Sequence, residues 1–206
     1  MALGLLVDLE ETNDCEGFEV IATRRLHRAK AIKVERYTAR AAEFLAYNPE
    51  APRVAALVIE AIRKRRRLLN VDHIGSTAVP GCGGKGIIDL LVSYPAGAVC
   101  AARDALDRLG FQPQGGPEPF PESRPMRVGA VTHGGKVYLV HSHVICAGDR
   151  EGQDLLKFRD RLRADADLVQ AYQFEKLAIV ARGITASREY SKAKGEFIRA
   201  VLADAC

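Results

Sequence analysis

Apolar residues recur at helical spacing in two neighbouring stretches of the N-terminal third of the chain. The first runs from 31 to 46 and the second from Asn48 to about Leu69, and this period predicts two helices. Asn48 followed by Pro49 is typical of a helix N-terminus, because Asn caps the first turn and proline fits it. The two segments are therefore expected to pack their apolar faces against a common core.

The first residues show no such period. The stretch 1–17 is polar and acidic, which predicts a partly disordered leader. A short strand is expected at 18–23, where Phe, Val and Ile stand close together. We find no internal repeat, so we expect one domain over 18–206.

Short apolar runs separated by glycine and proline fill the middle of the chain, which is the pattern of a β-sheet. The run 86–92 is apolar almost throughout, which predicts a central strand covered on both faces. A strand is expected before the glycines, and two more are expected on either side of a hairpin turn, at 71–74, 126–132 and 137–146. The prolines of 112–125 predict a long loop.

The remaining segments are helical in pattern. A helix is expected at 98–109, ending at Gly110. From 152 to the end the pattern is helical, with breaks near 164–166 and 183–185. This order of elements predicts an α+β fold, in which a mixed β-sheet is flanked by helices and followed by a helical C-terminal part.

Composition narrows the functional classes. The net charge is +4, tryptophan is absent and aromatic residues make up 6%, so nucleic acid is not an expected partner. No stretch approaches the roughly 18 apolar residues that cross a bilayer, so no membrane association is expected. The five cysteines show no metal-clip spacing, which predicts free thiols in a reducing cytoplasm.

The stretch from His73 to Val92 carries the chemistry: a strand, a glycine-rich loop and a second strand that contains one acid, Asp89. Small residues let a backbone approach a ligand, and successive N–H groups can surround an anion. The loop is not a Walker A loop, because Gly86 follows the lysine. We expect Asp89 to be functional, since a buried unpaired acid is costly. The expected phosphate contacts in the loop are Gly75, Ser76, Thr77 and Lys85.

His141 and His143 alternate along a predicted strand, so their side chains share one face. They can serve as metal ligands, or as a ligand beside a general base. The same alternation also occurs on a half-exposed strand with no site. Both interpretations stay open at this stage.

Basic and aromatic residues pair along the C-terminal helices. Tyr172 with Lys176, and Tyr190 with Lys194, are i, i+4 pairs, which places each lysine beside its tyrosine on one helix face. With Arg159 they can form a cationic wall for phosphates; the alternative is surface lysines packed on tyrosine rings. Two arginines next to the proline-rich loop can also reach an anion, namely Arg124 and Arg127.

Ile74-Gly75-Ser76, followed after twelve residues by Asp89-Leu-Leu-Val92, is similar to the signature of the nucleotidyltransferase superfamily. More closely, His73-Ile-Gly-Ser-Thr-Ala-Val-Pro-Gly81 with Ile87-Ile-Asp89 resembles the GrpB family of that superfamily, which also occurs fused to bacterial dephospho-CoA kinases. The likeness continues through Val140-His-Ser-His-Val144, Leu156–Arg163 and the tyrosine–lysine pairs, and it covers roughly residues 70 to 200.

The resemblance implies a nucleotidyltransferase-like fold, a nucleotide as substrate or ligand, and Mg²⁺ or Mn²⁺ as cofactor. Asp89 and His143 are then catalytic, both hold the metal with His141, and Arg159, Lys176 and Lys194 neutralise the phosphates. The superfamily has a second metal carboxylate where this chain has Leu91. The alternative is therefore a non-catalytic module that binds a ligand or assists a protein partner, such as a CoA-biosynthetic kinase.

Two other features have competing interpretations. Cys82, within the glycine-rich loop, is either a nucleophile activated by backbone N–H groups or a small apolar filler. The five basic residues 63–67 either bind nucleic acid or form the solvated C-terminal end of a helix, where cations are favoured by the helix dipole.

Overall fold

The computed structural model describes residues 32–41, 43–116, 119–184 and 186–203. The expected leader over 1–17 and the strand at 18–23 lie outside these residues. All elements below belong to one compact unit, Ala31–Cys206. Within the described part of the chain, no helix is both long enough and apolar enough to cross a membrane.

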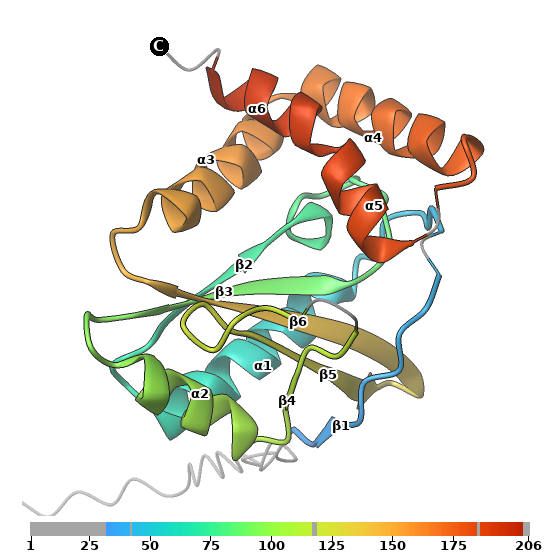
Figure 1. Ribbon diagram of the computed structural model, residues 1–206. Coiled ribbons are helices and arrows are strands. Elements are labelled where there is room, and N and C mark those ends of the chain that lie inside the picture. Colours follow the sequence, from blue (N-terminus) through green and yellow to red (C-terminus); the bar gives the residue numbers. More distant parts are fainter. Residues whose placement is uncertain (1–31, 42, 117–118, 185, 204–206) are drawn as a thin grey trace, which may run out of the picture. The chain divides into compact units, whose positions relative to one another are not determined.

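A mixed sheet forms the centre of this unit (Figure 1). Its strands lie in the order β1-β5-β6-β3-β2, with a short β4 on β5. β3 and β6 are parallel, whereas the other pairs are antiparallel. The strands are β1 (Val34–Glu35), β2 (Asn70–Ile74), β3 (Ile88–Tyr94), β4 (Gln112–Pro113), β5 (Met126–His133) and β6 (Lys136–Cys146). The expected mixed sheet of an α+β fold is confirmed.

Six α-helices flank the sheet on two sides. In Figure 1, α1 and α2 lie on one side and α3 to α6 on the other. The helices are α1 (Ala51–Arg65), α2 (Val99–Asp107), α3 (Arg150–Ala164), α4 (Ala166–Ala181), α5 (Ser187–Ala193) and α6 (Gly195–Ala203). The expected C-terminal breaks are confirmed, and α5 ends before α6 at one further break, near Lys194.

The main core lies between the sheet and the helices α1 and α2. It contains Val54 and Ile62 of α1, Leu106 of α2 and the strand residues Leu90 and Val140, all fully buried. The buried face of α1 explains its helical apolar period. The apolar run of β3 is continuous because β3 is an internal strand, covered on both faces. Burial of this apolar area is the main source of stability on that face.

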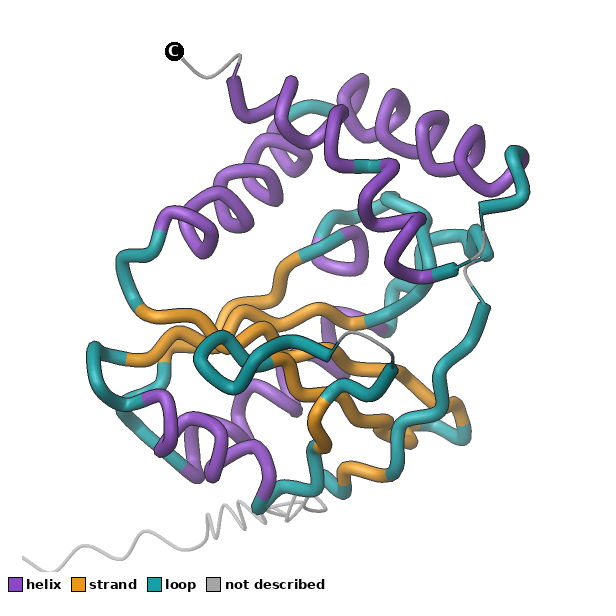
Figure 2. The backbone as a smooth tube through the Cα atoms, in the orientation of Figure 1, coloured by secondary structure: helices purple, strands orange, loops and turns teal. Residues whose placement is uncertain are grey.

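A second core joins the glycine-rich loop to the C-terminal helices. Val79 and Cys82 of the loop pack with Phe158 of α3 and Tyr172 of α4. The Tyr172 ring stacks on Phe197 of α6, with the ring centroids 5.3 Å apart. The loop 75–86 is therefore part of a packed core, although it is drawn as loop over most of its length in Figure 2.

The helix expected over 31–46 is wrong. Val34 and Glu35 form β1, which pairs with Val131 and Ala130 of β5, and the described residues that follow form no helix. Leu45 instead pairs with Gly84 of the loop through two backbone hydrogen bonds of 2.7 and 2.9 Å. Pairing with distant strands therefore outweighs the local period in this segment.

Two boundaries also differ from the sequence prediction. α1 begins at Ala51, and Asn48 acts just before it by accepting a hydrogen bond from the Glu50 backbone N–H at 3.0 Å. The expected 112–125 loop begins with β4, which pairs with β5. Gly110 follows the end of α2 with a φ of +102°, which confirms the expected stop.

Candidate functional site

Asp89 and the two predicted histidines lie together on one face of the sheet. In the parallel pair β3–β6, Asp89 stands opposite His141, and Leu91 stands opposite His143. Asp89 Oδ1 is 3.7 Å from His141 Nδ1 and 3.6 Å from His143 Nε2. One carboxylate oxygen therefore faces both imidazole rings.

The charges of this group are set by its burial and by its neighbours. Burial alone raises the pKa of Asp89, but the interaction with His143 and the nearby His141 and Lys194 outweigh it and hold the pKa below its usual value. Burial lowers the pKa of His141 to about 4, so this imidazole is neutral at pH 7. Its Nε2 and the Tyr37 hydroxyl share a hydrogen bond of 2.9 Å, which holds the ring beside the carboxylate.

Gly75 is required where β2 enters the loop. Its φ is +72°, a conformation that L side chains rarely adopt. A Cβ atom at this position would lie 2.6 Å from Asp89 Oδ2, which is closer than a real contact allows. Glycine therefore lets the loop approach the carboxylate.

Five backbone N–H groups of the loop are engaged in hydrogen bonds within the protein. Gly83 N–H donates to Gln173 Oε1 at 2.8 Å, and Gly84 N–H donates to Leu45 O. Three more donate to carbonyls within the loop, namely those of Ala78, Val79 and Cys82. The expectation that successive N–H groups surround an anion does not hold for these five residues, because close packing uses them.

Three lysines meet at two buried tyrosines. Lys176 Nζ lies 4.2 Å from the centroid of the Tyr172 ring, and Lys194 Nζ lies 5.0 Å from that of Tyr190. Lys85, from the loop, also lies over Tyr190, at 5.3 Å. Each i, i+4 pair therefore adopts the predicted contact, and the two pairs share one region with the loop.

Burial sets the charge of these lysines. It lowers the pKa of all three, and that of Lys194 falls to about 8 although the negative charge of Asp89 opposes the shift. The Lys176 ammonium donates to the carbonyl of Gly83 and lies 3.3 Å from Cys82 Sγ. Among the described residues, neither Lys176 nor Lys194 forms an ion pair with a carboxylate. Lys176 is therefore a buried cation beside rings, a carbonyl and a thiol, and Lys194 is a half-buried cation over a tyrosine ring.

Two of the predicted hydroxyl ligands have different surroundings. Thr77 Oγ1 donates to the carbonyl of Ile87 at 3.1 Å and accepts from His73 Nε2 at 2.9 Å, so it ties the loop to β2 and β3. Ser76 Oγ lies beside Gly84, where an added Cβ would come within 2.6 Å of it and 3.4 Å of Lys176 Nζ. The Ser76 hydroxyl thus lies on the side of the loop that faces Lys176, whereas the Thr77 hydroxyl already forms two hydrogen bonds within the protein.

Arg159 lies at the free edge of β2, away from the tyrosine–lysine pairs. Its guanidinium donates to the carbonyl of His73 at 3.1 Å, pairs with Asp160 at 2.8 Å and lies 3.8 Å from Asp72. Arg63, from the basic run, donates to the carbonyl of Val71 at 2.7 Å. The two arginines thus satisfy outward carbonyls of an edge strand, which protects the edge from pairing with another chain.

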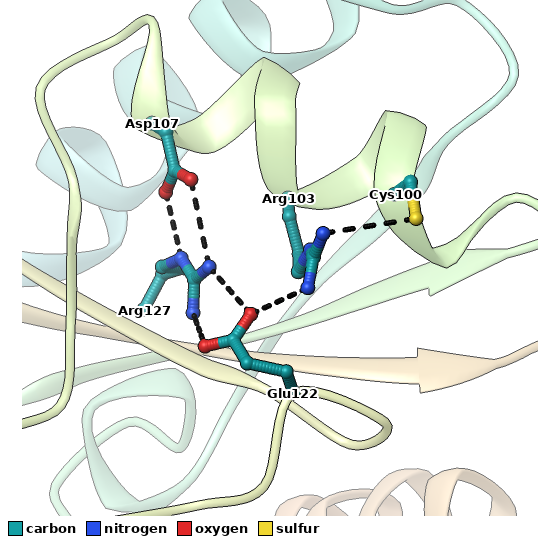
Figure 3. Close-up of polar contacts among 5 residues, drawn as sticks. All are labelled: Cys100, Arg103, Asp107, Glu122 and Arg127. Atoms are coloured by element: carbon teal, nitrogen blue, oxygen red, sulfur yellow. Dashed lines mark hydrogen bonds and ion pairs between the residues drawn. The ribbon is translucent and has the colours of Figure 1, made fainter.

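Arg127 lies on the opposite face of the sheet from Asp89. It is 4% exposed and forms hydrogen bonds and ion pairs with Asp107 of α2 and Glu122, as Figure 3 shows. Its Nε lies 2.6 Å from Asp107 Oδ1. Arg124 pairs with Glu151 instead. The structure therefore does not bring these two predicted anion contacts to the lysines.

The described residues do not fit the two-metal arrangement that the nucleotidyltransferase signature implies. The second carboxylate position, Leu91, is 1% exposed and packs with Ile74 and Ile145 beneath α3. Asp89 faces its two histidines directly, and none of the described groups of His, Cys, Asp or Glu has an arrangement that holds a metal ion. Mg²⁺ requires several oxygen ligands, and this face supplies one carboxylate.

Sequence reasoning missed three residues near the site: Tyr37, Phe44 and Gln173. Tyr37 and Phe44 belong to the segment that was assigned to a helix, which hid their role. Phe44 lies against Gly83 and 5.8 Å from Lys176 Nζ. Near this segment, a cavity of about 150 Å³ is lined by Lys85, Arg40, Lys136 and neighbouring residues, so it opens beside the loop lysine.

Comparisons with known proteins show the family of the chain. The model of the GrpB family, described as GrpB protein, matches residues 24–204. UPF0157 protein SCO7215 of Streptomyces coelicolor is 35% identical over 150 residues, which are 68% of this chain and 74% of that protein. UPF0157 protein PA4798 of Pseudomonas aeruginosa is 34% identical over 164 residues, covering 78% of this chain and 66% of that protein.

Two solved structures match the chain to different degrees. Conserved protein GrpB from Enterococcus faecalis matches with a TM-score of 0.61 and 24% identity, covering 79% of this chain and 96% of that one. The RNA terminal uridylyl transferase Cid1 matches with a TM-score of 0.46 and 14% identity, covering 64% and 40%. The fold is thus an α+β fold shared with GrpB. The chain belongs to the GrpB family, which confirms the resemblance found in the sequence.

Proposed function

We propose that this protein binds a nucleotide or another phosphorylated small molecule at a lysine–tyrosine site, formed by the loop 75–86, Asp89 and the lysines 85, 176 and 194 with Tyr172 and Tyr190. One observation carries the proposal: Lys176 and Lys194 are cations with no ion pair to a carboxylate among the described residues. Charges removed from water need a counter-charge, and phosphate oxygens supply one.

Three further observations support this proposal. The sequence carries the glycine-serine and aspartate elements of the nucleotidyltransferase signature on β2, the loop and β3. Gly75 brings the loop onto Asp89, and Gly84 brings Ser76 close to Lys176. A cavity of about 150 Å³ provides space beside Lys85.

A thermal-shift panel with nucleoside mono-, di- and triphosphates and phosphorylated CoA precursors tests the proposal. A ligand that binds only the folded protein raises the melting temperature by mass action. We expect a shift that Lys194→Gln removes. Lys192→Gln, an exposed lysine on the same helix, is the matched control and should keep the shift. A flat panel, or a shift that both variants retain, would contradict the proposal.

Catalysis of group transfer is the second candidate function, and the contact of Asp89 with His143 favours it. In this scheme an acceptor hydroxyl attacks the α-phosphorus of a nucleoside triphosphate, the bond to the β-phosphate oxygen breaks, pyrophosphate leaves, and His143, oriented by Asp89, takes the hydroxyl proton. The burial of Leu91 favours ligand binding without turnover instead, with or without a protein partner.

Release of labelled pyrophosphate distinguishes the two candidates. If the protein is a transferase, Asp89→Asn should abolish the release while the bound nucleotide is still detected by the thermal shift. Binding of nucleotide without release in the wild-type protein would assign the non-catalytic function.

A further inference from the structure

We infer that the site takes its phosphate group as a free anion held by the ammonium groups of Lys176 and Lys194, in place of the metal ions of the nucleotidyltransferase signature, and that its preferred ligand is a phosphate monoester. The inference rests on the proposed function and narrows its ligand class. It makes one distinctive claim, which is that divalent metal is not needed for binding.

The apolar surroundings of Leu91 exclude a second carboxylate at that position in this fold. Its side chain packs with Ile74 and Ile145, and Leu155 and Leu156 of α3 cover them. An acid there would be buried among apolar groups at a cost of several kcal/mol. The oxygen ligands for a pair of metal ions are therefore missing from this face.

One lysine ammonium lies against the loop, and a second one interacts with Asp89. Lys176 is 1% exposed, and its Nζ contacts the Gly83 carbonyl and Cys82 Sγ. Lys194 directly follows α5, and the charge of Lys176 lowers the pKa of Lys194. Their charges act at short range and are weakly screened because the site is buried.

Two buried polar atoms in this region support a ligand. The Tyr190 hydroxyl and His143 Nδ1 have no hydrogen-bond partner among the described residues. The Lys194 ammonium lies over the Tyr190 ring, and His143 contacts Asp89. Buried hydroxyl and imidazole groups are normally satisfied, so these atoms indicate contacts to a polar ligand.

The balance of charges indicates the ligand class. Lys176 and Lys194 supply two positive charges, and Asp89 supplies one negative charge, which raises the pKa of Lys194 against the effect of burial. A phosphate monoester carries nearly two negative charges at neutral pH. Nucleoside triphosphates chelate Mg²⁺ strongly in solution, so the metal neutralises phosphate oxygens that the lysines would otherwise contact. A monoester binds Mg²⁺ weakly and presents its phosphate oxygens to the lysines with or without the metal.

Isothermal titration calorimetry of the full chain with AMP and with ATP, each in EDTA and in excess Mg²⁺, tests the inference. We expect both nucleotides to bind in EDTA. Excess Mg²⁺ should weaken the affinity for ATP and change the affinity for AMP by no more than about twofold. Lys194→Gln should weaken the affinity for AMP by about tenfold or more, which is the usual effect of losing a hydrogen bond to a charged group. Lys192→Gln should have no effect, and circular dichroism checks that both variants fold.

Each outcome has a distinct meaning. Binding that requires Mg²⁺, or binding in EDTA that Lys194→Gln does not weaken, overturns this inference and leaves the wider proposal of ligand binding in place. Tighter binding of ATP in Mg²⁺ than in EDTA also overturns it. Absence of binding by every phosphate compound under both conditions overturns the inference and the proposed function together.

Discussion

Gly75 and Asp89 are in such close contact that a single methyl group cannot fit between them: a Cβ at Gly75 would lie 2.6 Å from Asp89 Oδ2. The residue is on the loop and the carboxylate is on β3, so this contact fixes the loop above the candidate site. Gly81, later in the same loop, has a similar φ of +76° but no neighbour within 4 Å of an added Cβ.

Gly75→Ala should therefore destabilise the protein more than Gly81→Ala. Both substitutions force alanine into a left-handed conformation, at roughly 1 kcal/mol. Only Gly75→Ala adds a clash, which we expect to cost about 1–3 kcal/mol more. Urea unfolding of both variants measures the difference. Equal losses would show that the loop does not rest on Asp89 in solution.

Arg127→Met should reduce stability and leave ligand binding unchanged. The guanidinium is 4% exposed and holds Asp107 and Glu122, so we expect a loss of about 2 kcal/mol in unfolding free energy. Because Arg127 lies on the other face of the sheet from Asp89, the thermal shift caused by a ligand should persist. Arg108→Met, an exposed arginine of the same region, is the control. If Arg127→Met, but not Arg108→Met, lost the thermal shift caused by the ligand, Arg127 would be part of the ligand site.

Stability should fall as the pH drops from about 6.5 to about 4. Burial lowers the pKa of both His141 and His73 to about 4. Between these pH values the two imidazoles are protonated in the unfolded chain but not in the folded chain, so acid favours unfolding. His141, 12% exposed, can contribute up to about 3 kcal/mol.

Unfolding curves at pH 7, 5.5 and 4.5 measure this slope. His141→Gln should flatten it, whereas His133→Gln, at the turn between β5 and β6, should retain it. An identical slope in both variants would contradict the buried, neutral state of His141.

Affinity for a phosphate ligand should fall as the pH rises above about 8. The pKa of Lys194 is lowered to about 8 by burial, with Asp89 and Cys82 raising it and Lys85 and Lys176 lowering it further. Ligand binding requires the charged form, so deprotonation weakens it. Lys194→Arg keeps its charge at every accessible pH and should remove the decline. Calorimetry with AMP from pH 7 to pH 9.5 checks this, and a parallel decline in Lys194→Arg would assign the effect to another group.

Much of the fold was predictable because local chemistry determines it. The apolar run of β3 predicts an internal strand, the turn at 133–136 predicts the β5–β6 hairpin, and Gly110 predicts the end of α2. The segment 31–46 failed because its conformation depends on partners far along the chain, Gly84 for Leu45 and Val131 for Val34. Spacing alone does not contain those contacts.

The candidate site was predictable where two residues share an element. His141 and His143 on one strand, and each tyrosine–lysine pair on one helix, follow from the geometry of strand and helix. The positions of Arg127 and Arg159 did not follow, because the face and the partner of an arginine depend on how the sheet is assembled. Likewise, nothing in the sequence shows that Gln173 occupies the N–H group of Gly83.

The central claim is that a phosphorylated ligand binds at the lysine–tyrosine site, and mapping of amide shifts in ¹H–¹⁵N NMR spectra during a titration with AMP tests it most directly. The account predicts that the largest shifts occur in the loop 75–86 and around Tyr190 and Lys194, and that Lys194→Gln removes them. Shifts confined to the surroundings of Arg63 and Arg159 at the edge of β2, or no shifts at saturating ligand, would contradict it.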